Sequence, residues 1–206
     1  MAKDRTTTSY AILGLLTVRD WTTYELAKQV QRSLNWFWPR AERKLYDEPK
    51  RLVEEGLATA DREHVGQRAR TVYRVTDAGR EALRSWLDDA PAPRLHEFEG
   101  MVKVFFADAG TTEQLITTLG RIEDEAAQRV ETIRGFASGD TPFPRRLHLR
   151  ALALPLQFEL EDAVRRWAHW AALQVAQWPA ADDAGSWDVA GVLDGLARGE
   201  SPIIAR

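Results

Sequence analysis

Residues 34–57 read LNWFWPRAERKLYDEPKRLVEEGL and place three aromatic residues and a proline directly before a segment crowded with charge. Pro39 suits the first turn of a helix, where its missing N–H would have no intrahelical partner anyway. Apolar residues then recur at intervals of three and four, which predicts a helix with one narrow apolar stripe. The stripe comprises Ala41, Leu45, Pro49, Leu52 and Val53.

Charged residues occupy the other side of this helix: Arg40, Arg43, Lys44, Asp47 and Arg51. We expect Pro49 to bend the helix, because it removes one backbone donor, and Gly56 to end it as a left-handed cap residue. This pattern favours a helix that is docked along one side and presented to a polyanion along the other.

The neighbouring segments predict a winged helix-turn-helix. Upstream, the apolar residues 9–18 predict a short buried helix, and the T-x-x-E box of Thr22 and Glu25 starts a second helix that runs to about Leu34. Downstream, residues 57–63 and 70–76 alternate as the strands of a hairpin. A further helix is expected from Asp77 to about residue 89.

The second half predicts only helices. We expect them at 97–107, at 111–136 behind a capping box of Thr111 and Gln114, and at about 146–178, where Pro155 introduces a kink. Two long amphipathic helices cannot bury both apolar stripes alone, so they need the N-terminal module, a second copy of the chain, or both. The dimerisation residues expected on the last long helix are Leu149, Leu152, Leu156, Leu160, Val164 and Trp167.

The expected fold class is therefore mainly α, with an N-terminal winged helix-turn-helix that has a two-stranded β wing and a C-terminal all-α dimerisation domain of long helices. We expect a DNA-binding domain at 1–90 and a helical dimerisation and effector domain at 91–180. Residues 181–206 are expected to form a tail with one short helix near 187–196.

Composition narrows the class of protein. Hydrophobic residues make up 44% and charged residues 29%, as in soluble globular proteins, and no apolar run approaches the length of a membrane span. The first ten residues lack a signal-peptide core, and the absence of cysteine excludes disulfides, so we expect a cytoplasmic protein. The net charge is −3, but residues 1–90 hold 16 Lys and Arg against 14 Asp and Glu.

The positions of these cations favour DNA binding over a merely solvated helix face. The basic helix follows a capped helix, as the groove-reading helix of a helix-turn-helix does. The predicted ribbon carries donors of its own that suit phosphate contact. Asp47 and its acidic neighbours Glu42 and Glu48 would oppose phosphates, pair with nearby cations, or accept a hydrogen bond from cytosine. Tyr46 would contact a phosphate or pack.

Eight tryptophans are many for this length. Core packing is the ordinary explanation, and a stacking pocket for a flat aromatic effector is the alternative, with Trp36, Phe37, Trp38 and Trp170 as its expected residues. The four histidines are scattered without ligand spacing, and no nucleophile elbow, phosphate loop or H-E-x-x-H motif occurs. We therefore expect no metal, no cofactor and no enzymatic activity.

Four stretches resemble the DNA-binding domain of the PadR family of bacterial transcriptional regulators: SYAILGLL (9–16), TTYELAKQV (22–30), LYDEPKRLVEEGLATA (45–60) and RTVYRVTDAGREALRSWL (70–87). The remainder is similar to the C-terminal helical domain of its larger members. The resemblance implies a homodimeric winged-helix repressor that releases DNA when a small molecule binds. The DNA-binding residues expected from the pattern and this resemblance are Tyr24, Arg40, Arg43, Lys44, Tyr46, Lys50, Arg62, Gln67, Arg68 and Arg70.

The sequence thus predicts a dimeric regulator that binds double-stranded DNA at an inverted-repeat operator, is modulated by a small aromatic effector and has no membrane partner. One rival is a winged-helix module that binds another protein instead of DNA. The other is an enzyme acting on a small aromatic molecule, for which the chain offers no nucleophile paired with a general base and no cofactor loop. A salt-dependent affinity for duplex DNA separates the first two.

Overall fold

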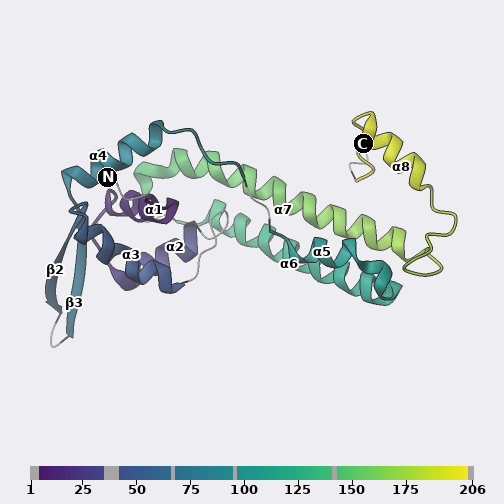
Figure 1. Cartoon of the computed structure of the whole chain (residues 1–206), viewed down its shortest axis with the longest axis horizontal. Helices are drawn as coiled ribbons and strands as arrows, with labels where there is room; N and C mark the ends of the chain where they lie inside the picture. The colour runs from purple at the N-terminus through teal and green to yellow at the C-terminus, as the bar shows by residue number, and fades with distance from the viewer. Residues whose placement is uncertain (1–4, 35–41, 66–67, 95–96, 141–142, 204–206) are drawn as a thin grey trace. The chain divides into compact units, whose positions relative to one another are not determined.

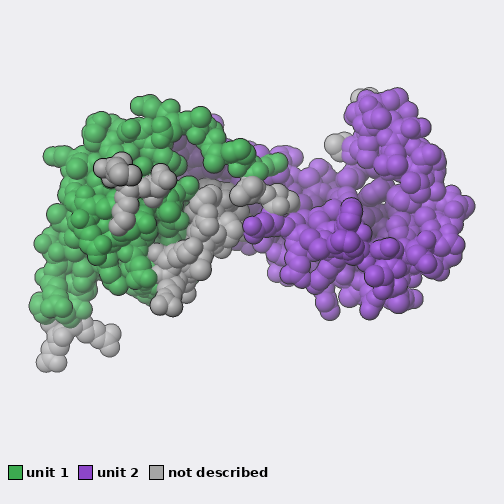
Figure 2. Space-filling model, viewed as in Figure 1, with its two compact units in different colours: residues 1–94 green, residues 95–206 purple. Residues whose placement is uncertain are grey.

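The computed structural model describes residues 5–34, 42–65, 68–94, 97–140 and 143–203. The chain forms two compact units, residues 1–94 and residues 95–206 (Figures 1 and 2). Within the described residues, paired strands of more than one residue occur only in the first unit. The predicted fold class, mainly α with a winged helix-turn-helix, is confirmed.

The N-terminal unit follows the predicted order of three helices, a hairpin and a further helix, with one strand that was not predicted. That strand, β1, pairs antiparallel with β3, so the sheet has three strands in the order β1-β3-β2. The elements are α1 (Thr7–Leu16), β1 (Trp21–Thr22), α2 (Thr23–Ser33), α3 (Glu42–Glu54), β2 (Ala58–Val65), β3 (Arg68–Val75) and α4 (Asp77–Asp88).

Local capping explains where these helices begin and end. The predicted box at Thr22 is present: its hydroxyl accepts from the Glu25 N–H, and the Glu25 carboxylate accepts from the Thr22 N–H. Gly56 has the expected positive φ of 72° after α3. Thr76 caps α4 and also donates its hydroxyl to the Gly56 carbonyl at 2.8 Å, which ties the start of α4 to the end of α3.

Of the predicted α3 stripe, Leu45, Pro49 and Leu52 are buried, Val53 is half-buried, and Ala41 lies outside the described residues. Leu45 and Leu52 are 3% and 0% exposed, and Pro49 is among the fully buried side chains. They face the apolar residues of α1 and α2. Complete burial of a large apolar side chain stabilises the fold by about 1.5–3 kcal/mol. The ring of Tyr10 stacks on that of Trp86 at 4.7 Å, which joins α1 to α4.

The placement of Arg51 on the outward, cationic side of α3 was wrong. Its Nη2 donates to the buried hydroxyl of Ser9 on α1 and to the Glu48 carboxylate at 2.6 Å. Arg51 also lies 3.6 Å from Glu55, which accepts from Arg5 at 2.8 Å. Arg51 therefore joins α3 to α1 from the inner side.

The second unit is built on two long helices that pack side by side in opposite directions, α6 and α7 (Figure 1). The apolar stripe of α6 is buried throughout, from Leu115 to Ile133. The helix α7 continues through Pro155. The elements are α5 (Glu99–Phe105), η1 (Ala107–Ala109), α6 (Thr112–Ser138), η2 (Pro144–Arg146), α7 (Leu147–Val175) and α8 (Val189–Ala197).

The α7 stripe behaves differently in its two halves. Trp167 packs against the buried cluster of Leu115, Leu119 and Val175 of its own unit. By contrast, Leu152 and Leu156 are 76% and 57% exposed, and Leu149 and Leu160 are exposed as well. The N-terminal half of α7 therefore presents an uncovered row of leucines.

Candidate nucleic-acid interface

The candidate interface consists of α3 and the wing, the ribbon of β2 and β3. Several of its predicted residues lie outside the described part of the structure: Arg40 and Gln67 entirely, and Arg43, Lys44 and Arg68 for their side chains. Of the others, Lys50 is exposed on α3, and Tyr24, at the start of α2, is 66% exposed. Tyr46 is half-buried.

Two acidic residues of α3 pair with cations of the same helix. Asp47 accepts from Lys50 at 3.3 Å, and both side chains are exposed. Glu48 accepts from Arg51 on the inner side and is 9% exposed. Of the three explanations for these acids, pairing with cations is therefore the one that Asp47 and Glu48 follow. The side chain of Glu42 lies outside the described part of the structure.

The two faces of the wing differ in charge. Successive strand residues point to opposite faces, so Arg62 and Glu63 lie on opposite sides of β2. Arg62 is exposed and pairs across the ladder with Thr71. Arg70 stands directly opposite Glu63 and donates to it at 2.9 Å. Arg62 thus remains available to a polyanion, whereas Arg70 is already paired with a carboxylate.

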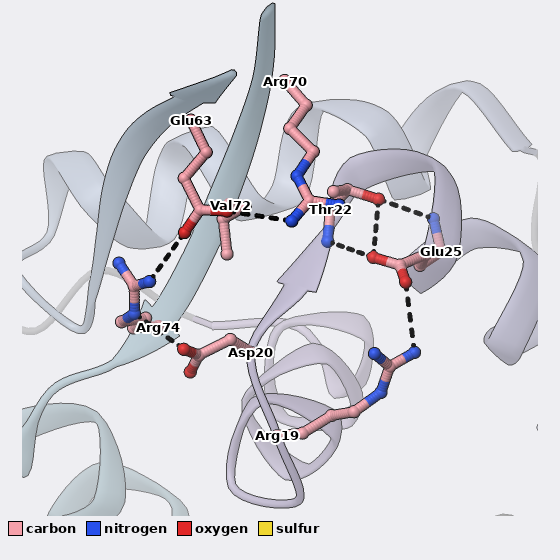
Figure 3. Close-up of a pocket in the computed structure, with 8 residues that line it drawn as sticks. All are labelled: Arg19, Asp20, Thr22, Glu25, Glu63, Arg70, Val72 and Arg74. Atoms are coloured by element: carbon pink, nitrogen blue, oxygen red, sulfur yellow. Dashed lines mark hydrogen bonds and ion pairs between the residues drawn. The ribbon is translucent and has the colours of Figure 1, made fainter. Parts of the chain in front are cut away.

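Glu63 belongs to a larger charged cluster at the base of the wing, around an open pocket of about 230 Å³ (Figure 3). Arg74 on β3 donates its Nε to Asp20 at 2.7 Å and its Nη2 to Glu63 at 2.9 Å, and it also pairs with Asp61. On the other side of the pocket, Arg19 donates to Glu25 at 3.3 Å. The guanidinium of Arg19 lies 3.8 Å from the centre of the Trp21 ring.

These contacts lower the pKa values of two acids, Glu63 and Glu25. Hydrogen bonds from Arg70 and then Arg74 hold the pKa of Glu63 below its ordinary value of 4.5. The pKa of Glu25 is also lowered, most strongly by the hydrogen bond from the Thr22 backbone N–H. Burial opposes this shift, and the Thr22 hydroxyl and Arg19 add smaller lowering effects. Both acids are therefore ionised at neutral pH.

We expect acid to weaken the N-terminal unit through these acids. Because their pKa is lower in the folded than in the unfolded chain, their contribution is present above about pH 4.5 and is lost as the pH falls through the folded value. The thermal midpoints of the wild type and of Glu63→Gln, measured at pH 7 and at an acid pH below the folded pKa of Glu63, should differ slightly at pH 7 and converge at the acid pH. An equal gap at both pH values would contradict this assignment.

Sequence reasoning missed Arg74 and Asp20. The available signal was the alternation of the strands. Asp61 and Glu63 of β2 lie on the same face of the sheet as Arg70 and Arg74 of β3. Recognising this pattern required the register of the hairpin. The Asp20 contact could not be found in this way, because β1 was not predicted and Asp20 is 54 residues from Arg74.

The predicted effector site stays a prediction, because three of its four residues are not described. Trp36, Phe37 and Trp38 lie outside the described residues. Trp170 lies 6.4 Å from the ring of Trp187, which in turn donates to Gln174 at 3.1 Å. A separate apolar pocket of about 510 Å³ lies between the C-terminal end of α6 and the N-terminal half of α7, with Phe158 and Arg150 in its lining.

The described ranges hold neither a membrane-spanning helix nor a metal cluster. No helix there has the length and apolarity needed to cross a membrane. In the same residues, no group of three or more histidine or acidic side chains is arranged to hold a metal ion.

Comparison with known proteins gives the same domain order. Residues 12–85 match the Transcriptional regulator PadR-like family, and residues 99–175 match the family described as Virulence activator alpha C-term. The negative transcriptional regulator PadR of Bacillus subtilis is 32% identical over 99 residues, which are 47% of this chain and 54% of that regulator. The aligned region thus spans about half the length of this relative.

Solved structures show the same fold over most of the chain. Bacillus subtilis PadR in complex with operator DNA has a TM-score of 0.71 at 23% identity, covering 82% of this chain and 99% of that one. The same protein in complex with p-coumaric acid has a TM-score of 0.63 at 23% identity, and the match covers 85% of this chain and 99% of that one. The Vibrio cholerae virulence activator AphA has a TM-score of 0.63 at 25% identity, and the match covers 82% of this chain and 98% of that one. Residues 12–85 of this chain therefore form a domain of the PadR-like family of transcriptional regulators.

Proposed function

We propose that this chain is a cytoplasmic, homodimeric transcriptional regulator, and a repressor, that binds operator DNA through α3 and the wing and has no enzymatic activity. The observation that carries the proposal is the PadR-like domain at 12–85, folded as a winged helix with Lys50 and Arg62 exposed on α3 and the wing. A relative with the same fold is a negative regulator and has been solved with operator DNA.

The dimer follows from the exposed leucines of α7. A row of large apolar side chains open to water is unfavourable, and a second copy related by a two-fold axis would cover it with the same residues. Two reading helices related by that axis would enter the major groove about 34 Å apart. The operator is therefore expected to be an inverted repeat.

Salt dependence of duplex binding tests this function. Fluorescence anisotropy with a labelled duplex, measured between about 50 and 200 mM salt, should show affinity falling steeply as salt rises. Binding that is absent at low salt would contradict DNA recognition and favour the rival, a winged-helix module for another protein.

Arg43→Ala with Lys44→Ala should weaken binding to every duplex. For each phosphate that is no longer neutralised, the slope of log affinity against log salt becomes shallower by about 0.9. The matched control is Arg84→Ala with Lys103→Ala, which removes two exposed cations outside the interface and should leave the slope unchanged. Equal slopes for the test variant and the wild type would contradict a phosphate contact by Arg43 and Lys44.

A small aromatic effector is proposed by analogy with the relative that was solved with p-coumaric acid. A ligand changes operator affinity only if it binds the two dimer arrangements differently. Titration of the protein–operator complex with p-coumaric acid, with Trp38→Ala as the test variant, would examine the tryptophan site expected from the sequence. An unchanged response in Trp38→Ala would remove Trp38 from that site.

A further inference from the structure

The outer part of the wing lacks the support that its base has. β1 pairs with β3 only at Trp21↔Tyr73 and Thr22↔Val72. Beyond these pairs, β2 and β3 continue to the pair Val65↔Arg68, and no third strand among the described residues joins them there. Because a two-stranded ribbon is marginally stable by itself in water, its direction needs an additional constraint.

Arg74 provides contacts at the place where this constraint is needed. Its one guanidinium reaches Asp20, which precedes β1, and Asp61 and Glu63, which lie on β2. It thereby links all three parts of the sheet (Figure 3). Glu63 is held a second time by Arg70, which carries the linkage toward the turn. A planar guanidinium suits this role because its donors form a fixed fork.

We propose that Arg74 is a positioning residue that clamps the wing to the body of the N-terminal unit through Asp20, Asp61 and Glu63. The proposal builds on the DNA-binding function proposed above, but the clamp itself exists without DNA. Its four groups are between 35% and 58% exposed, so the contacts add little to global stability. Their effect is on the orientation and opening of the ribbon.

Amide hydrogen exchange of the DNA-free full chain tests the clamp directly. In Arg74→Gln, peptides covering residues 59–65 should exchange about fivefold faster, and in Asp20→Asn about twofold faster, because the ribbon opens locally more often. Arg74→Lys keeps the charge without the fork and should fall between wild type and Arg74→Gln. Arg84→Gln, which removes an exposed arginine paired with Glu81 on α4, is the control and should leave the wing unchanged. Wild-type exchange in Arg74→Gln overturns the proposal, whether or not the chain binds DNA.

Duplex binding distinguishes the clamp from a direct phosphate contact of Arg74, because the two models predict opposite changes of affinity in Asp20→Asn. A misplaced wing should weaken binding in both Arg74→Gln and Asp20→Asn, because the phosphate contacts of the wing are lost in both variants. If Arg74 instead contacts phosphate, Arg74→Gln should lower the slope by about 0.9. Asp20→Asn should then strengthen binding, because it removes a negative charge near DNA. That pair of results overturns the clamp, whereas a wild type without duplex affinity contradicts only the DNA-binding function.

Discussion

Gly79→Ala is expected to destabilise the N-terminal unit by about 3 kcal/mol, at the upper end of the cost of overpacking. Gly79 lies in the first turns of α4, against the segment that ends α3. A Cβ at this position would stand 2.1 Å from the Leu57 carbonyl oxygen and 3.0 Å from a methyl group of Val75. The carbonyl is backbone, and it accepts from the Thr76 N–H at 3.1 Å, so it cannot move without loosening the start of α4.

Thermal or denaturant unfolding followed by circular dichroism measures this loss. Gly14→Ala is the matched control: Gly14 also lies in a helix of the same unit, but a Cβ there meets nothing within 4 Å. Alanine has the higher helix propensity, so Gly14→Ala should stabilise the unit by about 0.5–1 kcal/mol. A Gly79→Ala variant as stable as the wild type would show that α4 does not approach Leu57 this closely.

Leu152→Glu with Leu156→Glu is expected to raise the dissociation constant of the dimer by about 100-fold or more. Full burial of each leucine contributes about 1.5–3 kcal/mol, and a symmetric interface would contain both residues twice. In the single chain these side chains are 76% and 57% exposed, so the substitution should leave the fold of the monomer intact. Analytical ultracentrifugation over a range of concentrations measures the dissociation constant.

Leu193→Glu serves as the control, because Leu193 is 60% exposed but lies on α8 in the tail. The same variants should then be compared for affinity toward an inverted repeat and toward a single half-site. Loss of the dimer should weaken binding to the inverted repeat and leave the half-site unaffected. A leucine variant that remains dimeric would place the dimer interface on another surface.

Much of the fold could be predicted because the determining signals are local. The capping boxes at Thr22 and Thr111, the left-handed Gly56 and the buried stripe of α6 each depend on residues within a few turns of one another. Helix periodicity also predicted which side of α3 is buried. It failed for Arg51, because a long side chain on the margin of the stripe can turn inward when Ser9 and Glu48 accept from it.

The candidate site was predictable only in part. Arg62 and Lys50 are exposed as a phosphate contact requires, although Lys50 is paired with Asp47, and the roles of both stay predictions. Arg70 was expected to contact DNA, but the register of the hairpin places it opposite Glu63, with which it forms an ion pair. Charge counting along the chain cannot show which cations are already neutralised, because pairing depends on which strands are neighbours.

The sequence by itself determined the order of the elements, the helix ends and most of the apolar stripes, because capping and periodicity act between neighbours along the chain. Only the tertiary structure decided the third strand, the inward turn of Arg51 and the joining of Asp20 to Arg74. Each of these depends on groups that are 42 to 54 residues apart in sequence and meet only when the sheet and helices pack. Contacts of this kind are set by strand register and helix packing, which no local pattern specifies.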